Sequence, residues 1–120
     1  MKQLIVTIFL ILAAELSYSQ TEINVDSASN HEGEIVKICT MIYGGKFLES
    51  SKSQLTFLDA GAAYPNQKLT VLIWGNKRSN FKKAPEVFYK DKNVCIVGKI
   101  EIYKGKSEII ANSEDQITIQ

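Results

Sequence analysis

The chain has 120 residues and a formal net charge of +1, with 45% hydrophobic and 22% charged residues. Residues 20–120, which remain after an expected leader is removed, are enough for one small domain with its own core and too few for two domains. A net charge this close to zero is lower than a dedicated nucleic-acid-binding protein usually carries.

Residues 1–19 are predicted to be a secretory signal peptide. One positive charge precedes an apolar run of eleven residues, Leu4 to Ala14. As a helix this run spans about 16 Å, well short of a bilayer core of roughly 30 Å. Small residues occupy the −3 and −1 positions before Gln20, so cleavage is expected after Ser19; an uncleaved anchor or a buried helix is the alternative. We therefore expect an exported protein, periplasmic or secreted, with no stable membrane span in the mature chain.

The first half of the mature chain is predicted to contain one long, bent strand. Residues 20–32 are polar and are expected to be a flexible lead-in that ends in a short turn or helix. From Glu34 to Tyr43 apolar residues alternate with others, which is typical of a half-buried strand. The pair Gly44-Gly45 is expected to break or bend that strand.

Two shorter strands and a helical segment follow. The strands are residues 54–59 and 68–74, joined by a turn around Tyr64-Pro65-Asn66. The second reads KLTVLIW, a nearly continuous apolar run that indicates burial on both faces or a large apolar outer face. Residues 78–89 have helical spacing instead, and Pro85 limits them to one short helix followed by a turn.

The clearest alternation lies in residues 92–117. Residues 94–103 alternate strictly between two faces, which predicts a strand. A tight connection at Lys104-Gly105-Lys106 leads into a second strand, residues 108–111. Residues 116–120 are expected to extend that last strand after a turn at residues 112–115.

The predicted order is three strands, one short helix and two strands. The absence of alternating helices excludes a parallel doubly wound fold. An all-β, five-stranded Greek-key barrel with one short helix between strands three and four, the OB-fold, matches this order.

Four segments carry a resemblance to a known family: EIVKIC, FLDAGAAYPNQKLTVLIWG, Phe81, and VCIVGKIEIYKGKSEIIANSEDQI. The most specific part is Val97-Gly98-Lys99-Ile100 followed by the Tyr-Lys-Gly-Lys hairpin. Across residues 23–119 the chain resembles small exported bacterial OB-fold proteins related to nucleic-acid-binding OB domains of the tRNA-anticodon-binding type. The resemblance implies the fold, and it implies nucleic-acid binding by analogy.

No catalytic, metal or cofactor constellation stands out in the sequence. The chain has one histidine, His31, and neither cysteine is near it in sequence, whereas zinc sites use three or four ligands. Arg78 is the single arginine, and the carboxylates Asp59, Glu86 and Glu101 belong to different elements. We therefore expect a protein that is not an enzyme and that uses no cofactor.

A binding site is the favoured functional hypothesis. OB-folds bind ligands on strands two and three and in the loops between strands one and two and strands four and five, and single-strand binding needs aromatic faces and cationic side chains. Residues 77–106 contain nine lysine or arginine residues against three acidic ones, which indicates either a polyanion-binding zone or a solvated face. The candidate ligand-binding residues are Tyr43, Lys46, Tyr64, Trp74, Lys99, Tyr103, Lys104 and Lys106, with Phe47 and Lys52 nearby.

Two alternatives accompany that hypothesis. Trp74, Phe57, Phe81 and Phe88 are expected to be core residues, because aromatic side chains dominate small cores. The partner is expected to be single-stranded nucleic acid or another polyanion; the alternative is a protein or an oligosaccharide of the cell envelope.

The cysteines, Cys39 and Cys95, are expected on the outer faces of two neighbouring antiparallel strands. That placement and an oxidising compartment permit a disulfide. The register of the two strands is not readable from the sequence, so two separate small hydrophobic residues are the alternative.

Overall fold

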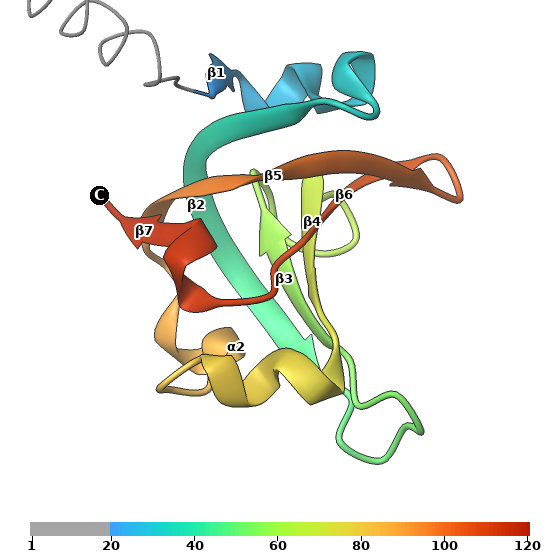
Figure 1. Cartoon of the computed structure of the whole chain (residues 1–120), viewed down its shortest axis with the longest axis vertical. Coiled ribbons are helices and arrows are strands. Elements are labelled where there is room, and N and C mark those ends of the chain that lie inside the picture. The colour runs from blue at the N-terminus through green and yellow to red at the C-terminus, as the bar shows by residue number, and fades with distance from the viewer. Residues whose placement is uncertain (1–19) are drawn as a thin grey trace, which may run out of the picture.

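The computed structural model of the chain describes residues 20–120, and the expected signal peptide lies outside the described residues. The prediction of an all-β domain is confirmed, since seven strands carry the fold and the helices are short (Figure 1). Within residues 20–120 no helix is both long enough and apolar enough to cross a membrane.

The strands are, in chain order, β1 (Thr21–Ile23), β2 (Ile35–Phe47), β3 (Thr56–Ala60), β4 (Leu69–Ile73), β5 (Asn93–Tyr103), β6 (Lys106–Ile110) and β7 (Ile117–Ile119). Between them lie three 3₁₀ helices and one α-helix: η1 (Val25–His31), η2 (Gly75–Asn80), α2 (Pro85–Phe88) and η3 (Glu114–Gln116).

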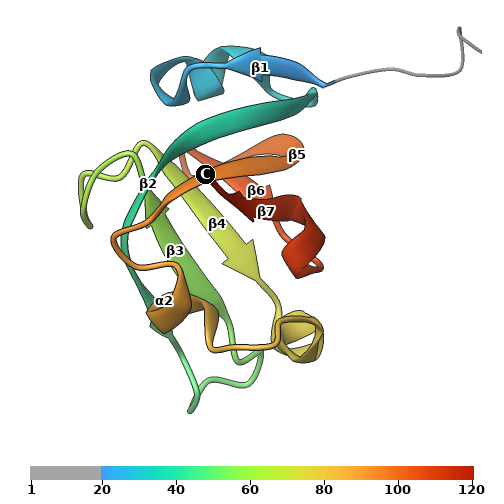
Figure 2. The ribbon, with the colours of Figure 1, turned by 90° about the vertical axis from the view of Figure 1, so that its left-hand side faces the viewer.

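Five of the strands form a closed ring in the order β2–β3–β4–β6–β5, because β5 also pairs with β2. Every neighbouring pair in the ring is antiparallel except β4 and β6, which are parallel. The long strands β2 and β5 each pair with different neighbours along their two halves (Figures 1 and 2). The ring therefore has no free edge, while β1 and β7 are added outside it.

The glycine pair bends β2, as the sequence predicts. The register of β2 against β3 shifts between Ile42 and Gly44, which marks a bulge at that point. A Cβ atom on Gly45 would lie 2.4 Å from the carbonyl oxygen of Phe57, so that position accepts no side chain without movement of the neighbouring strand. The close approach of β3 to β2 therefore depends on Gly45.

The core fills the ring with the inward-facing residues of each strand. The alternation predicted for β2 and β5 is confirmed, since Ile38, Ile42, Ile96 and Ile100 have no exposed surface. The apolar strand β4 sends alternate residues to each side of the sheet. Those that point inward and are fully buried are Leu69, Val71 and Ile73. Burial of these branched side chains supplies the main driving force for folding.

The helical segment between β4 and β5 differs from the predicted helix over residues 78–89. The chain forms η2 first and α2 afterwards, with Pro85 in the first turn of α2. Proline is favoured there because its missing N–H would be unpaired in any helix. Phe81 lies between the two helices and is buried, as expected of a core residue.

Two short strands differ from expectation. The lead-in is predicted to be flexible, yet β1 pairs in parallel with β2. Residues 116–120 do not extend β6; β7 pairs with β5 instead. The side chain of Gln116 explains the turn, because its Nε2 donates to the carbonyls of Val97 and Ile110 and its Oε1 accepts from the N–H of Asn112.

Candidate ligand-binding grooves

The outer face of β3, β4, β6 and β5 carries a groove of about 760 Å³, here called the Trp74 groove. Its floor is apolar and aromatic, with Phe57 from β3, Leu72 from β4 and Ile110 from β6. Trp74, at the end of β4, keeps 41% of its surface exposed, and Tyr103 on β5 keeps 58%. Large exposed aromatic side chains inside a groove are typical of a ligand site.

A second groove of about 690 Å³ adjoins the first and is here called the Tyr64 groove. Four cationic or aromatic side chains from three segments meet in it: Lys46 at the end of β2, Tyr64 in the β3–β4 loop, and Lys104 and Lys106 at the β5–β6 hairpin. The two grooves share Phe57, Tyr103 and Glu108, so they form one continuous surface.

A third, more polar hollow of about 600 Å³ lies on the other side of Trp74. Lys52 from the β2–β3 loop and Lys77 from η2 line it. Because Trp74 lines both this hollow and the Trp74 groove, a ligand that crosses the indole ring can reach lysines at either end.

The register of the strands shows how the floor of the Trp74 groove is built. Phe57 pairs with Leu72, and Leu72 pairs with Ile110, which gives an apolar stripe across three strands. Lys46 is the partner of Phe57 at one end of the stripe. At the other end of the stripe, β5 and β6 pair at Ile100 and Ile109. Because the two strands are antiparallel, Lys99 on β5 then lies opposite Ile110 on β6. The apolar stripe therefore has a lysine at each end.

A polar row runs beside the apolar stripe. Asp59 pairs with Thr70, Thr70 with Glu108, and Glu108 with Glu101. Burial raises the pKa of Asp59. Burial, and then the charge of Glu101, raises the pKa of Glu108. None of these three carboxylates forms an ion pair or a hydrogen bond with another described side chain.

Seven of the eight predicted ligand-binding residues line the two grooves. Tyr43 does not: it is exposed on β2 at the bulge and lines neither groove. Phe47 lines neither groove, and the guanidinium carbon of Arg78 lies 3.6 Å from the centre of its ring. The residues that meet at the grooves are Lys46, Tyr64, Trp74, Lys99, Tyr103, Lys104 and Lys106.

Arg78 on η2 contacts residues of β2, β3 and α2. Its two terminal nitrogens donate to both carboxylate oxygens of Glu86, at 2.9 Å and 3.1 Å, and Nη1 also donates to the Thr56 hydroxyl at 2.8 Å. Burial alone would raise the pKa of Glu86, but the hydrogen bonds and charge of Arg78 lower it overall. These contacts and the stacking on Phe47 give Arg78 a structural role.

Sequence reasoning misses the floor and the polar row of this surface. Phe57 is predicted to be a core residue, and for Trp74 a core position is the alternative to a binding role, yet both lie on the outer face with Leu72. The continuous apolar run of residues 68–74 is the available signal, since it allows a large apolar outer face. The acidic partners Glu101 and Glu108 give no signal, because only the register places them opposite each other.

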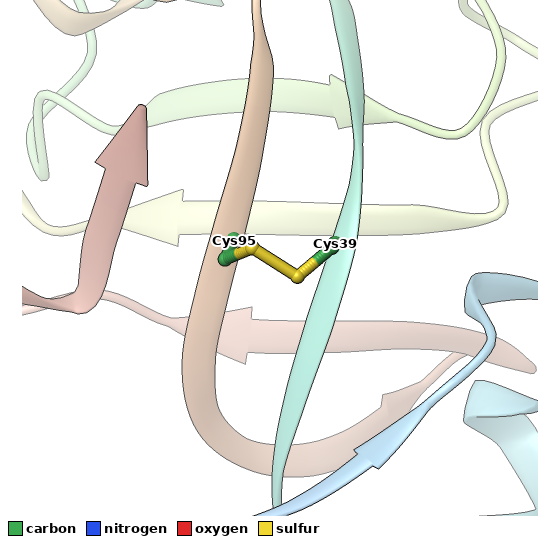
Figure 3. Close-up of a disulfide and its surroundings, with 2 residues drawn as sticks. All are labelled: Cys39 and Cys95. Atoms are coloured by element: carbon green, nitrogen blue, oxygen red, sulfur yellow. A yellow bond between two sulfur atoms is a disulfide. The ribbon is translucent and has the colours of Figure 1, made fainter. Parts of the chain in front are cut away.

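Cys39 and Cys95 form a disulfide with an S–S distance of 2.07 Å (Figure 3). They are direct partners in the antiparallel pairing of β2 and β5, so their side chains lie on the same face. The bond fastens the two longest strands of the ring to each other and lies outside the grooves. In residues 20–120 no group of three or more His, Cys, Asp or Glu side chains is placed to hold a metal ion.

Comparison with known proteins shows a likeness of fold. No protein-family model matches the sequence, and no curated protein matches it. Among solved structures, the crystal structure of a protein assigned as an aspartyl-tRNA synthetase from Leishmania major Friedlin matches 87% of this chain with a TM-score of 0.53 and 12% sequence identity. This chain covers 21% of that protein, so the likeness concerns one part of a much longer chain.

Proposed function

We propose that the protein is an exported OB-fold module that binds single-stranded nucleic acid across the Trp74 and Tyr64 grooves. The pairing order of the five-stranded ring, with β4 parallel to β6 and a helical segment between β4 and β5, supports a Greek-key OB barrel. The binding surface then corresponds to the strands and hairpin with which OB-folds hold their ligands.

The observation that carries this proposal is the exposure of Trp74 and Tyr103 on one surface with lysines around it. Bases stack on aromatic faces whatever their sequence, and each such stacking interaction contributes about 1–3 kcal/mol. Lys46 and Lys99 flank the apolar stripe, and Lys104 and Lys106 line the adjoining groove, so a sugar-phosphate backbone has cations at both ends of the stacking surface.

Two likenesses, one of sequence motifs and one of fold, support nucleic acid as the ligand class. The chain resembles nucleic-acid-binding OB domains in its sequence motifs, and its fold is like part of a protein named for tRNA. Fold likeness alone does not determine function, so the groove chemistry has to carry the assignment.

We also propose export and a role in binding without catalysis. The apolar run at residues 4–14 and the disulfide between Cys39 and Cys95 support an oxidising compartment. The single arginine is engaged by Glu86, Thr56 and Phe47, which removes the side chain best suited to stabilising charge on a reacting phosphate.

An oligosaccharide of the cell envelope is the second candidate ligand. The observation that favours it is the row of Asp59, Glu108 and Glu101, because carboxylates repel phosphates but accept hydrogen bonds from sugar hydroxyls. Aromatic side chains such as Trp74 pack well against the apolar faces of sugar rings. A neutral glycan would bind with little dependence on salt, whereas the binding of a polyanion would weaken as salt increases.

Fluorescence anisotropy of the mature domain with a labelled single-stranded oligonucleotide tests the proposal. Binding is expected at low salt, with an affinity that falls linearly with salt on logarithmic axes. The triple variant K99Q/K104Q/K106Q should lose most of the affinity. The slope of the logarithm of its binding constant against the logarithm of the salt concentration should become shallower by about 0.7 for each phosphate that is no longer neutralised. The matched control K82Q/K83Q/K90Q removes three lysines that line neither groove and should bind normally. Absence of binding at low salt, or an equal decrease in affinity in the two variants, would overturn the proposal.

A further inference from the structure

The Glu101–Glu108 pair destabilises the folded protein. Like charges directly opposite each other on neighbouring strands are destabilising, and here no described lysine lies close enough to form an ion pair with either carboxylate. Both residues line the Trp74 groove beside the exposed aromatic side chains. Opposed, unneutralised titratable groups within a groove are typical of functional sites.

The position of this pair relative to the apolar stripe defines what it can contact. Leu72 in the stripe and Thr70 in the polar row are two residues apart on β4, which places the row roughly 7 Å along the strand from the stripe. A base that stacks on the stripe therefore directs one edge toward the polar row. The lysines at the two ends of the stripe would then hold the phosphates of such a ligand.

The polar row presents hydrogen-bond acceptors. Ionised Asp59, Glu101 and Glu108 can only accept, and Thr70, which is 7% exposed, offers little of its hydroxyl to a ligand. The edge of a bound base must then supply donors. Because the burial and charge that raise the pKa of Glu108 disfavour its ionised form, a donor from the ligand would relieve that cost.

The four bases differ in the donors that they offer on the Watson–Crick edge. Guanine presents two adjacent donors, N1–H and the N2 amino group, which fit both oxygens of one carboxylate. Adenine and cytosine present one amino group next to an acceptor nitrogen. Thymine and uracil present one N–H between two carbonyl oxygens, and the carboxylates repel these oxygens.

We propose that Glu108 and Glu101 make the groove selective for guanine in single-stranded nucleic acid. This inference rests on the proposed function and extends it, because the lysines and aromatic residues provide affinity for any sequence while the paired glutamates select one base. Glu108 is the more enclosed of the two and is the principal specificity-determining residue.

The test uses two labelled single-stranded DNA oligonucleotides of about twelve nucleotides, one with isolated guanines among thymines and one with inosine in place of every guanine. Inosine lacks only the N2 amino group, so the backbone charge and the stacking are retained. The mature protein is expected to bind the guanine oligonucleotide about tenfold more tightly.

Two variants separate recognition from general effects. In E108Q and in the double variant E101Q/E108Q, the affinity for the guanine oligonucleotide divided by that for the inosine oligonucleotide should fall close to one. Both oligonucleotides should still bind, because the lysines are unchanged. The control D115N alters an exposed carboxylate on η3 and should keep the tenfold ratio. Equal affinity of the unaltered protein for both oligonucleotides would overturn the guanine preference and leave the proposed function standing. Absence of any binding at low salt would overturn both.

Discussion

Glu101 on β5 lies directly opposite Glu108 on β6, and neither carboxylate has a cationic partner within ion-pair distance among the described residues. Burial and the neighbouring charge raise the pKa of Glu108. The repulsive Glu101–Glu108 pair therefore lies on the same surface as the exposed aromatic side chains Trp74 and Tyr103. A groove with this combination is better explained by ligand recognition than by stability.

Replacing Glu108 with glutamine should increase stability at neutral pH by about 0.5 kcal/mol, because it removes a like-charge cross-strand pair. The pKa of Glu108 is raised above 4.5 in the folded protein, so its destabilising effect develops as pH rises through the window above 4.5. Below that window Glu108 is protonated in both the folded and the unfolded protein, and the difference should vanish. Urea denaturation of both proteins at about pH 7 and pH 3 measures it, and an equal gain at both pH values would contradict the electrostatic explanation.

Glu86 has the opposite pH dependence. Arg78 lowers the pKa of Glu86 below 4.5, so the pair stabilises the fold above that value and the contribution is lost as pH falls through the folded pKa. At neutral pH, E86Q should lose about 2 kcal/mol, since Arg78 keeps its charge in a partly buried position. R78K is the matched variant: it keeps the charge but loses the two-pronged hydrogen bond and the stacking on Phe47. Urea denaturation should show a loss of stability in both variants; an unchanged midpoint in R78K would show that charge alone matters.

The two glycines of the bulge are expected to respond differently to alanine. G45A should lose about 3 kcal/mol, because the new Cβ would meet the Phe57 carbonyl oxygen at 2.4 Å. G44A should be unchanged within about 0.5 kcal/mol, because its nearest neighbour is a side-chain oxygen of Asp59 at 3.9 Å. Thermal unfolding of the two variants side by side checks this, and equal effects would contradict the described packing of β2 on β3.

This pair also shows where sequence reasoning stops. The alternation of β2 and β5 is sufficient to assign the buried residues Ile38, Ile42, Ile96 and Ile100. The dipeptide Gly44-Gly45 is sufficient to predict a bend. Which glycine is indispensable depends on how closely β3 approaches, and that is a property of three-dimensional packing.

The candidate site is predicted unevenly for a similar reason. Lysines in hairpins and at strand ends, such as Lys104 and Lys106, are exposed in almost any packing, so the sequence identifies them. Trp74 closes an apolar run, which favours a core position, and only the inward orientation of Ile73 places it outside. Pairings between distant segments, such as Glu101 with Glu108 or β7 with β5, depend on register, which local pattern does not determine.

Removing the disulfide should destabilise the domain without abolishing binding. Cys39 and Cys95 are 56 residues apart, so the chain-entropy contribution of the cross-link is roughly 4 kcal/mol. The double variant C39A/C95A should shift the urea midpoint accordingly and still bind oligonucleotide at low temperature, because the bond lies outside the grooves. Unaltered protein treated with reductant provides the control, and equal stability with and without reductant would contradict the cross-link.

The most direct test of the central claim uses the single tryptophan of the chain, Trp74. If bases stack on it, titration of the mature domain with single-stranded oligonucleotide should quench its fluorescence in a saturable manner that weakens as salt increases. W74F should retain part of the affinity measured by anisotropy, and W74A should lose about 1–3 kcal/mol of binding free energy. Fluorescence unchanged at saturating oligonucleotide, together with normal binding by W74A, would contradict the claim that this groove holds nucleic acid.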